Sequence, residues 1–403
     1  MKPKKVLVIC DYTFPFSTGG AGRVIYEINK RLQKKGYDFT IISQSENNTN
    51  FDETVDGMRI IGFANPHHGL KFSTYRALQP IKIVKDLLKT TQFDLIHHHN
   101  MLSSAGIIML KKNFNIPSLY TFHGPYDKEL EVGIKHSKHK RGLLKKVILF
   151  LFVKVLSKLQ GAMIKRVTTV ITLSNYMKSE CEEKKLNPNK VKIIPGGVDI
   201  KRFTPAENPD SLREKFGLPK NKKVLLTVRR LEARMGIHHL IDAMPKLIQK
   251  DPNIMLVIVG KGSHKDTFQN LIDNQNLNEN VKLQGFVSEE DLTHLYQTAS
   301  LFIMPSLALE GFGLSTLESL ACGVPVVASP NGANPEILTQ LEPTLVSKGY
   351  TSDALGSSIE LALKNKWIAE NPTAKQKCRD FATLHSWDII ADRYSTLYKT
   401  IEN

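Results

Sequence analysis

Two glutamates eight positions apart, Glu310 and Glu318, frame the segment of this chain that is richest in groups able to bind a ligand. Between them a glycine-rich turn leads into an apolar helix pattern, in the order Gly311, Phe312, Gly313, Leu314 and Ser315. Glycines before a helix let backbone N–H groups approach an anion closely, and the helix N-terminus adds partial positive charge. A carboxylate can accept two hydrogen bonds from vicinal hydroxyl groups. The segment therefore favours a site for a diphosphate joined to a sugar, although the same turn is also an ordinary α/β connection.

The segment continues as Ser-Leu-Ala-Cys-Gly-Val-Pro-Val-Val-Ala, and as a whole it resembles the Glu-x7-Glu motif of retaining, family-4-type glycosyltransferases of the GT-B fold. The resemblance implies two doubly wound, Rossmann-like α/β domains that face a cleft. It also implies transfer of a sugar from a nucleotide-diphospho-sugar. In that scheme the amides at Gly313–Ser315 hold the diphosphate, Glu318 binds the ribose, and Glu310 binds the donor sugar.

Short β-rich runs alternate with helical patterns along the chain, which predicts βαβ units with parallel sheets. Predicted strands are 5–10, 39–43, 58–63, 95–98, 118–122, 169–173 and 191–194, then 223–228, 255–259, 281–284, 301–304 and 324–328. Glycine and proline cluster in 195–209, which places a domain boundary there. We expect an N-terminal, acceptor-side domain over 1–197 and a nucleotide-sugar-binding domain over 198–386. The resemblance implies that a helix in 387–403 packs back on the first domain; packing on the second is the alternative.

A glycine-rich loop, Ser17-Thr-Gly-Gly-Ala-Gly-Arg23, follows the first predicted strand and opens a helix. This position suits phosphate binding. The loop is not the dinucleotide fingerprint, because Ile25 stands at the third glycine position, and no Gly-Lys-Ser/Thr follows. The resemblance implies that Gly19 and Gly20 let the first domain approach the donor diphosphate.

His123 follows another predicted strand, at the end where parallel α/β sheets place ligands. A lone histidine is more often structural, but this one matches the family's strand-end histidine, which contacts the transferred sugar. We expect no shared metal site for His97, His98 and His99, because side chains of consecutive strand residues alternate between faces.

The segment from Val228 to Gly236 closes the first strand of the second half and is rich in arginine. Guanidinium groups recognise phosphate through paired hydrogen bonds, although a solvated charged loop is the alternative. The family has arginine followed five residues later by lysine, both on the diphosphate. Arg230 matches the arginine, Met235 departs from the lysine, and Arg234 is the neighbouring candidate. Backbone groups around Phe286 and Val287 are expected to contact the nucleobase.

No Asp-x-Asp sequence occurs, so we expect no metal-bridged diphosphate, no metal site and no cofactor. The four cysteines, Cys10, Cys181, Cys322 and Cys378, form no Cys-x-x-Cys pair, which favours a reduced, cytoplasmic setting. No signal peptide is recognised, and no apolar run is read as long enough to span a membrane.

The net charge of +16 is concentrated, because 132–179 contains eleven Lys or Arg and no Asp or Glu. Lys146, Lys154 and Lys158 share one face of a predicted helix beside apolar residues. The basic stretch 135–166 therefore favours an anionic membrane surface, at the inner face of the cell membrane. The alternatives are a solvated or core-packed helix and a nucleic-acid surface. No nucleic-acid motif accompanies the stretch, so we expect no nucleic-acid partner.

The sequence does not identify the nucleotide sugar that donates the sugar or the molecule that accepts it. UDP-sugars are favoured on family frequency, with GDP-mannose next, and the acceptor is expected to be a glycan, a lipid-linked or a cell-envelope molecule. Two alternative functions remain: a nucleotide-sugar epimerase or phosphorylase on the same fold, and a catalytically silent envelope-assembly protein. Both glutamates of the motif are present, which disfavours the silent protein.

Overall fold

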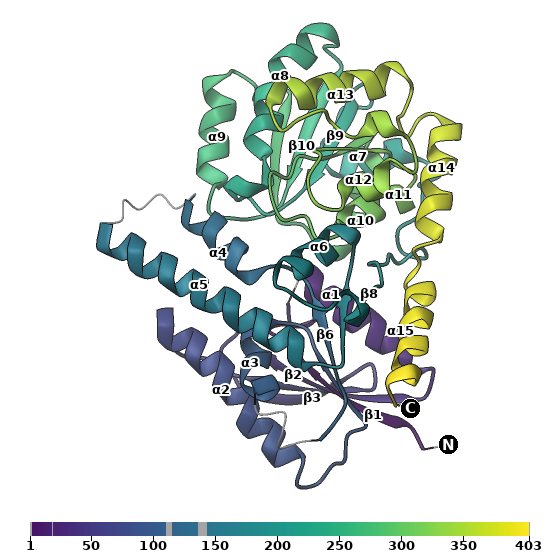
Figure 1. Cartoon of the computed structure of the whole chain (residues 1–403). Helices are drawn as coiled ribbons and strands as arrows, with labels where there is room; N and C mark the ends of the chain where they lie inside the picture. The colour runs from purple at the N-terminus through teal and green to yellow at the C-terminus, as the bar shows by residue number, and fades with distance from the viewer. Residues whose placement is uncertain (1, 18, 110–114, 136–142, 403) are drawn as a thin grey trace. The chain divides into compact units, whose positions relative to one another are not determined.

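The computed structural model describes residues 2–17, 19–109, 115–135 and 143–402. The chain divides into two compact units (Figure 1). Unit 1 comprises Met1–Gly196 together with Trp387–Asn403, and unit 2 comprises Gly197–Ser386. Each unit is a sheet covered by helices, so each has its own hydrophobic core.

Unit 1 contains an eight-stranded sheet in the order β3-β4-β2-β1-β5-β6-β7-β8. Its strands are β1 (Lys4–Ile9), β2 (Tyr37–Gln44), β3 (Phe51–Val55), β4 (Met58–Phe63), β5 (Leu95–His98), β6 (Ser118–Phe122), β7 (Thr169–Thr172) and β8 (Val191–Ile193). All neighbours pair in parallel except β3, which pairs antiparallel with β4. Strand β3 is not among the predicted strands, because this edge strand is largely exposed and has no apolar alternation to mark it.

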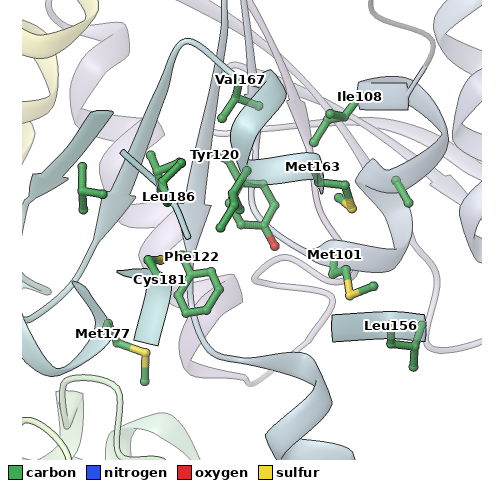
Figure 2. Close-up of a cluster of buried hydrophobic side chains, with 14 residues drawn as sticks. Met101, Ile108, Tyr120, Phe122, Leu156, Met163, Val167, Met177, Cys181 and Leu186 are labelled. Carbon is green, nitrogen blue, oxygen red and sulfur yellow. The ribbon is translucent and has the colours of Figure 1, made fainter. Parts of the chain in front are cut away.

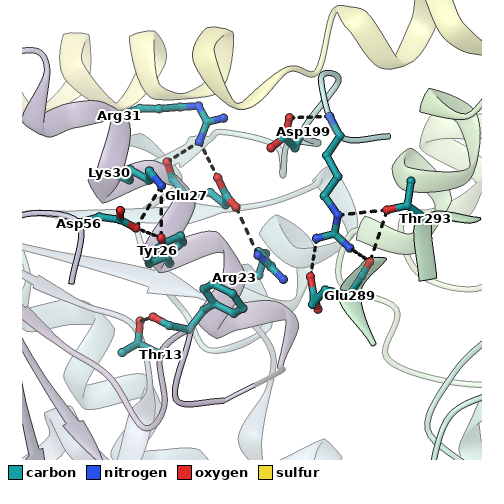
Figure 3. A network of polar contacts seen from close by, with 12 residues as sticks. Thr13, Arg23, Tyr26, Glu27, Lys30, Arg31, Asp56, Asp199, Glu289 and Thr293 are labelled. Carbon is teal, nitrogen blue, oxygen red and sulfur yellow. Dashed lines mark hydrogen bonds and ion pairs between the residues drawn. The ribbon is translucent and has the colours of Figure 1, made fainter. Parts of the chain in front are cut away.

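The helices of unit 1 are α1 (Gly20–Gln33), α2 (Gly69–Leu87), α3 (Met101–Met109), α4 (Tyr126–Lys135), α5 (Leu143–Arg166), α6 (Asn175–Glu183) and α15 (Trp387–Glu402), with a short 3-10 turn, η2 (Pro188–Lys190). Helix α15 packs along α1. On α1 the buried Glu27 binds Arg31 at 2.6 Å (Figure 3), and Arg31 in turn reaches Asp388 of α15 at 2.9 Å. Residues from the two ends of the sequence thus share one core.

Helix α5 presents two different faces. Its buried side chains recur at helical spacing, and several of them, including Leu156 and Met163, pack with Tyr120 and Phe122 of β6 (Figure 2). The opposite face is also apolar but is exposed: Val147, Ile148, Phe150, Leu151 and Val155 are each between 48% and 60% accessible. These five apolar side chains are therefore not covered by the part of unit 1 that the structure describes.

By length and composition alone, the stretch Val147–Arg166 of α5 is long and apolar enough to cross a membrane. The expectation that no segment reaches this length is therefore wrong, since only the uninterrupted apolar run was counted. A third of the most apolar part of this helix is buried in unit 1, and core helices of globular proteins meet the same criterion.

Unit 2 contains a five-stranded parallel sheet in the order β11-β10-β9-β12-β13. Its strands are β9 (Lys223–Val228), β10 (Ile254–Val259), β11 (Val281–Gly285), β12 (Leu301–Met304) and β13 (Val326–Ala328). Its helices are α7 (Pro209–Lys215), α8 (Ile237–Lys250), α9 (Lys265–Asn274), α10 (Glu289–Thr298), α11 (Leu314–Ala321), α12 (Asn334–Leu338), α13 (Ser352–Lys364) and α14 (Pro372–Thr383), with 3-10 turns η3 (Ala233–Met235) and η4 (Pro343–Leu345). The segment that enters this unit is fixed by Arg202, whose guanidinium binds Glu289 and Thr293 of α10 (Figure 3).

The strand order in each unit identifies where a ligand would bind. In unit 2 the chain builds outward from β9 through β10 to β11, and then continues on the other side of β9 with β12 and β13. Such a reversal opens a crevice at the carboxyl ends of the two strands that flank it, here β9 and β12. In unit 1 the corresponding reversal lies between β1 and β5.

Candidate functional site

A buried ion pair occupies the strand reversal of unit 2. Arg229 immediately follows β9, and Ser306 and Glu310 lie in the loop after β12. The Arg229 guanidinium donates from Nη2 to Glu310 Oε2 at 2.5 Å and to Ser306 Oγ at 2.7 Å. Ser306 Oγ donates to Glu310 Oε2 at 2.9 Å. Glu310 is 8% accessible, so a negative charge is held at the crevice by a matched positive charge.

Glu310 is predicted from the sequence, whereas Arg229 and Ser306 are found only in the structure. Arg230, which was predicted from the sequence, is exposed, and among the described residues it is Arg229 that pairs with Glu310. The two arginines are adjacent at the end of a strand, so their side chains point in different directions. Which of the two arginines faces Glu310 depends on the pleat of β9 at its end, and the sequence does not show this.

Two glycines hold the backbone of this pair in place. A Cβ on Gly260, after β10, would lie 1.9 Å from the carbonyl oxygen of Arg229. A Cβ on Gly332, after β13, would lie 2.0 Å from the carbonyl oxygen of Glu310, and Gly332 has a positive φ of 61°. Leu309, just before Glu310, also adopts a positive φ of 59°. Non-glycine residues rarely occupy this region, so the loop that presents Glu310 is strained where the carboxylate is positioned.

The helix start predicted from the sequence is present beside the ion pair. Gly313 is the N-cap of α11 in the left-handed conformation, with φ of 83°. No side chain caps this end, and Leu314 and Ser315 are half-buried, so their N–H groups lie among the unpaired donors of the first turn. Phe312 is buried, and Gly311 is half-buried. This geometry suits an anion at the start of α11.

Glu318 lies one turn further along α11 and is half-buried. Its Oε2 accepts a hydrogen bond of 3.0 Å from the hydroxyl of Tyr296. Burial and the neighbouring carboxylate raise the pKa of Tyr296 well above its usual value, so this hydroxyl stays protonated and donates. The bond fixes one carboxylate oxygen of Glu318.

The remaining predicted residues of unit 2 lie at the same carboxyl edge of its sheet. Phe286 and Val287 follow β11; Phe286 is 60% accessible, and the Lys261 ammonium lies 4.9 Å from its ring centre. Arg234 is half-buried and donates to the carbonyl of Ala308 at 3.5 Å. Met235 is buried, and its sulfur lies 3.0 Å from Arg229 Nη2.

In unit 1 the glycine-rich loop is shorter than expected, because α1 begins at Gly20 with Gly19 as its N-cap. No side chain caps this helix start. A Cβ on Gly22 would lie 3.2 Å from the backbone of Tyr12 and Thr13, so this glycine lets the helix start pack closely on the loop after β1. Gly19 has no such neighbour, and Gly20 is exposed.

His123 follows β6 and contacts a second histidine. Its Nε2 lies 3.1 Å from Nδ1 of His99, which follows the neighbouring strand β5, and the two rings stack. Burial lowers the pKa of His123 to about 4, and burial together with nearby His97 lowers that of His99 well below its usual range. Both imidazoles are therefore neutral near pH 7. One ring nitrogen of His123 is held by His99, which orients the other.

A polar cavity of about 490 Å³ lies at the carboxyl ends of β1, β2 and β4. Its lining includes Tyr12, Gln44, Asn65 and His67. At its side Arg76 is buried and binds Asp11 at 3.0 Å, Gln44 at 2.7 Å and the hydroxyl of Tyr12 at 2.7 Å. Sequence reasoning missed this group, because its members come from separated segments with no shared motif.

Within the part of the chain that the structure describes, no group of three or more His, Cys, Asp or Glu is arranged to hold a metal ion. His97 instead binds Thr121 and Tyr398 through its two ring nitrogens, each at 2.7 Å.

Comparison with known proteins gives matches along most of the chain. Residues 18–202 match the family model described as Glycosyltransferase Family 4, and residues 208–380 match the model described as Glycosyl transferases group 1.

Two relatives are informative. The GDP-mannose-dependent monoacylated alpha-(1-6)-phosphatidylinositol monomannoside mannosyltransferase of Corynebacterium glutamicum is 33% identical over 51% of this chain and 55% of its own length. This match therefore spans only about half of either protein. The UDP-Gal:alpha-D-GlcNAc-diphosphoundecaprenol alpha-1,3-galactosyltransferase of Escherichia coli is 28% identical over 78% of this chain and 77% of its own.

Among solved structures, the sucrose-phosphate synthase of Thermosynechococcus elongatus is similar over 99% of both chains. It has a TM-score of 0.83 and 21% sequence identity. At this level of identity the likeness concerns the fold.

Proposed function

Because this chain belongs to the family 4 glycosyltransferases and has their GT-B fold, as the sequence predicted, we propose that it is a retaining enzyme that transfers a hexose from a nucleoside-diphosphate sugar to a lipid-linked glycan. The observation that carries the proposal is the edge of unit 2. There a charge-paired Glu310, the uncapped start of α11 and Glu318 follow one another along a single segment.

Each group has a separate role in this proposal. The N–H groups at Gly313–Ser315, with Arg230 and Arg234, bind the diphosphate. Glu318, held by Tyr296, accepts hydrogen bonds from the ribose. Glu310 accepts hydrogen bonds from the donor sugar. In unit 1, the neutral imidazole of His123 is assigned a hydrogen bond to a sugar hydroxyl. Gly19 and Gly20 leave room at the start of α1 for the diphosphate, and the backbone near Phe286 and Val287 faces the base.

The reaction proposed for this arrangement forms the new bond on the face of the sugar from which the leaving group departs. The glycosidic C1–O bond to phosphate breaks, the acceptor oxygen attacks C1, and the departing phosphate oxygen takes the acceptor proton. The groups of unit 2 then act by positioning the donor and by stabilising the charge that develops on the phosphate.

Direct binding measurements test this function. Calorimetry with UDP-glucose, UDP-galactose, UDP-N-acetylglucosamine and GDP-mannose is expected to show micromolar to millimolar binding of at least one donor. UDP-sugars are favoured, as in the sequence analysis, and GDP-mannose follows; the names of the two relatives include one donor of each kind. Failure of every nucleotide sugar to bind would overturn the proposal.

Incubation with the same nucleotide sugars distinguishes a transferase from an epimerase or a phosphorylase. A transferase releases nucleoside diphosphate only slowly without an acceptor and leaves the sugar unchanged. An epimerase converts the sugar without any acceptor, and a phosphorylase requires free phosphate. Chromatography of the donor after incubation with and without phosphate distinguishes these outcomes.

The acceptor is proposed to be a lipid-linked glycan; the names of the relatives support the lipid and a cavity in unit 1 supports the glycan. Both relatives carry a lipid in the name of their acceptor, phosphatidylinositol monomannoside in one and diphosphoundecaprenol in the other. The cavity lined by Tyr12, Gln44 and Asn65 offers hydroxyl and amide groups suited to a glycan.

The exposed face of α5 fits an acceptor that resides in a membrane. Its exposed apolar residues Phe150, Leu151 and Val155 are interspersed with the exposed Lys154 and Lys158 on the same side of the helix. An apolar surface flanked by cations binds the boundary of an anionic bilayer. We propose that α5 lies on the cytoplasmic face of the membrane as a peripheral anchor. Of the expected basic stretch, residues 136–142 lie outside those that the structure describes.

Replacing Phe150, Leu151 and Val155 together with serine is expected to reduce sedimentation with phosphatidylglycerol-containing vesicles about tenfold or more, because three side chains of apolar contact are lost. Leu78→Ser is the matched control, since Leu78 is 58% accessible on α2 of the same unit. Equal sedimentation of the triple variant and the wild type would exclude this face as the anchor.

A further inference from the structure

Arg229 has more hydrogen-bond donors than its neighbours use. Within the described residues, the hydrogen bonds of its side chain are all made by Nη2, to the carboxylate of Glu310, the hydroxyl of Ser306 and the sulfur of Met235. A guanidinium carries five N–H donors. Its Nε is buried without a hydrogen-bond partner, and the side chain as a whole is 11% accessible. Buried N–H groups are normally hydrogen-bonded, so the unused N–H groups of Arg229 indicate that a bound ligand supplies the missing hydrogen-bond acceptor.

The position of Arg229 indicates which chemical group would accept these hydrogen bonds. It stands at the reversal between β9 and β12, where an open α/β sheet binds its ligand. The guanidinium also contacts Glu310, the carboxylate to which the proposed function assigns the sugar. In a nucleotide sugar the phosphate is attached to the same ring that this carboxylate would bind. Two anions, the phosphate and Glu310, would therefore lie close together and repel each other unless a cation stands between them.

We propose that Arg229 binds a phosphate oxygen of the donor diphosphate through its unused N–H groups while Nη2 keeps its bond to Glu310. This inference rests on the proposed function and adds to it a residue that joins the diphosphate site to the sugar site. Arg229 contacts the substrate, and it also positions Glu310.

Met235 supports this assignment. It stands where the resemblance predicts a lysine for the diphosphate, and its sulfur lies 3.0 Å from Arg229 Nη2. The arginine from the end of β9 thus occupies the space that a longer, charged side chain at 235 would need. The positive charge at this point of the site comes from β9 instead of from η3.

The test measures binding of UDP and GDP, without sugar, by calorimetry. Arg229→Gln keeps a donor for Glu310 but removes the charge, and it is expected to weaken nucleoside-diphosphate binding about 10-fold to 100-fold. Adding Met235→Lys to this variant returns a cation to the same point and is expected to recover part of that loss. Glu310→Gln alone is expected to leave binding unchanged or stronger, because it releases Arg229 from its carboxylate partner.

The matched control is Lys223→Gln. Lys223 lies at the opposite end of β9 and binds Asp251 at 2.7 Å. Its removal is expected to leave nucleotide binding unchanged. A purely structural role for Arg229 would lower the melting temperature without the specific recovery by Met235→Lys.

The possible results separate the two proposals. If the wild type binds neither UDP nor GDP, the proposed function fails and this inference fails with it. If the wild type binds and folded Arg229→Gln binds equally well, only the role of Arg229 is overturned. Should Arg229→Gln not fold, the double variant Arg229→Gln/Glu310→Gln removes both members of the buried pair and is compared with Glu310→Gln alone. Equal binding by these two proteins also overturns the inference.

Discussion

Glu310→Gln is expected to lower kcat/KM for sugar transfer about 1000-fold, or about 4 kcal/mol, while the protein remains folded. The amide retains the size of the side chain and can still accept hydrogen bonds from Arg229 and Ser306. It loses the negative charge that the proposed function uses to hold the donor hydroxyls. Steady-state kinetics with the donor identified by calorimetry measures the effect.

Replacing Glu310 with alanine is expected to affect stability as well as activity. The sequence alone suggests that Glu310→Ala abolishes transfer in a folded protein. The structure adds that this change leaves the guanidinium of Arg229 buried without its carboxylate. Breaking a buried pair in this way costs about 3–5 kcal/mol of stability. We therefore expect Glu310→Ala to lower both activity and melting temperature, and only the glutamine variant isolates the catalytic effect.

Glu360→Gln is the control for these measurements. Glu360 pairs with Lys250 at 2.6 Å on the exposed surface of unit 2, where an ion pair contributes little to stability. It is expected to match the wild type in rate and in melting temperature. Wild-type activity in Glu310→Gln would remove Glu310 from the donor-sugar site.

Gly332→Ala is expected to reduce activity about 100-fold without changing any group that could touch a substrate. The new Cβ would lie 2.0 Å from the carbonyl oxygen of Glu310, so the loop that carries this residue must move. A displacement of about 1 Å in a catalytic group lowers rates by about this factor. The positive φ of Gly332 adds about 1 kcal/mol or more of strain for alanine.

Kinetics and thermal unfolding of this variant should therefore change together. Gly349→Ala provides the comparison, because its Cβ would meet only the Cβ of Ala354 at an ordinary 3.5 Å. If Gly332→Ala retained full activity, the close packing of Gly332 on Glu310 would have no part in positioning the carboxylate.

Much of the fold could be predicted from the sequence because parallel strands buried on both faces are continuous apolar runs. Strands such as β1, β9 and β10 have this character, and the structure contains them within a residue or two of the predicted bounds. The exposed edge strand β3 has no such run, so its antiparallel pairing with β4 was missed. The same counting of uninterrupted runs overlooked the length of α5.

The candidate site was less accessible to sequence reasoning. Glu310, Gly313 and Glu318 lie in one segment, and their spacing together with the family resemblance predicted a ligand there. Arg229 is 81 positions from Glu310 in the chain, and the two meet only because β9 and β12 are neighbours in the sheet. The choice between Arg229 and Arg230 depended on which side of a strand end each one occupies. No role was predicted for His99, yet its ring nitrogen lies 3.1 Å from that of His123, because β5 and β6 are neighbours in the sheet.

The return of α15 to unit 1 fixes an order in which the protein can mature during synthesis. All of unit 2 is synthesised before Tyr398, whose hydroxyl lies 2.7 Å from Nδ1 of His97, is added to the chain. Unit 1 therefore begins first but cannot complete its core until α15 is available, whereas unit 2 is continuous in sequence and needs no later segment to fold.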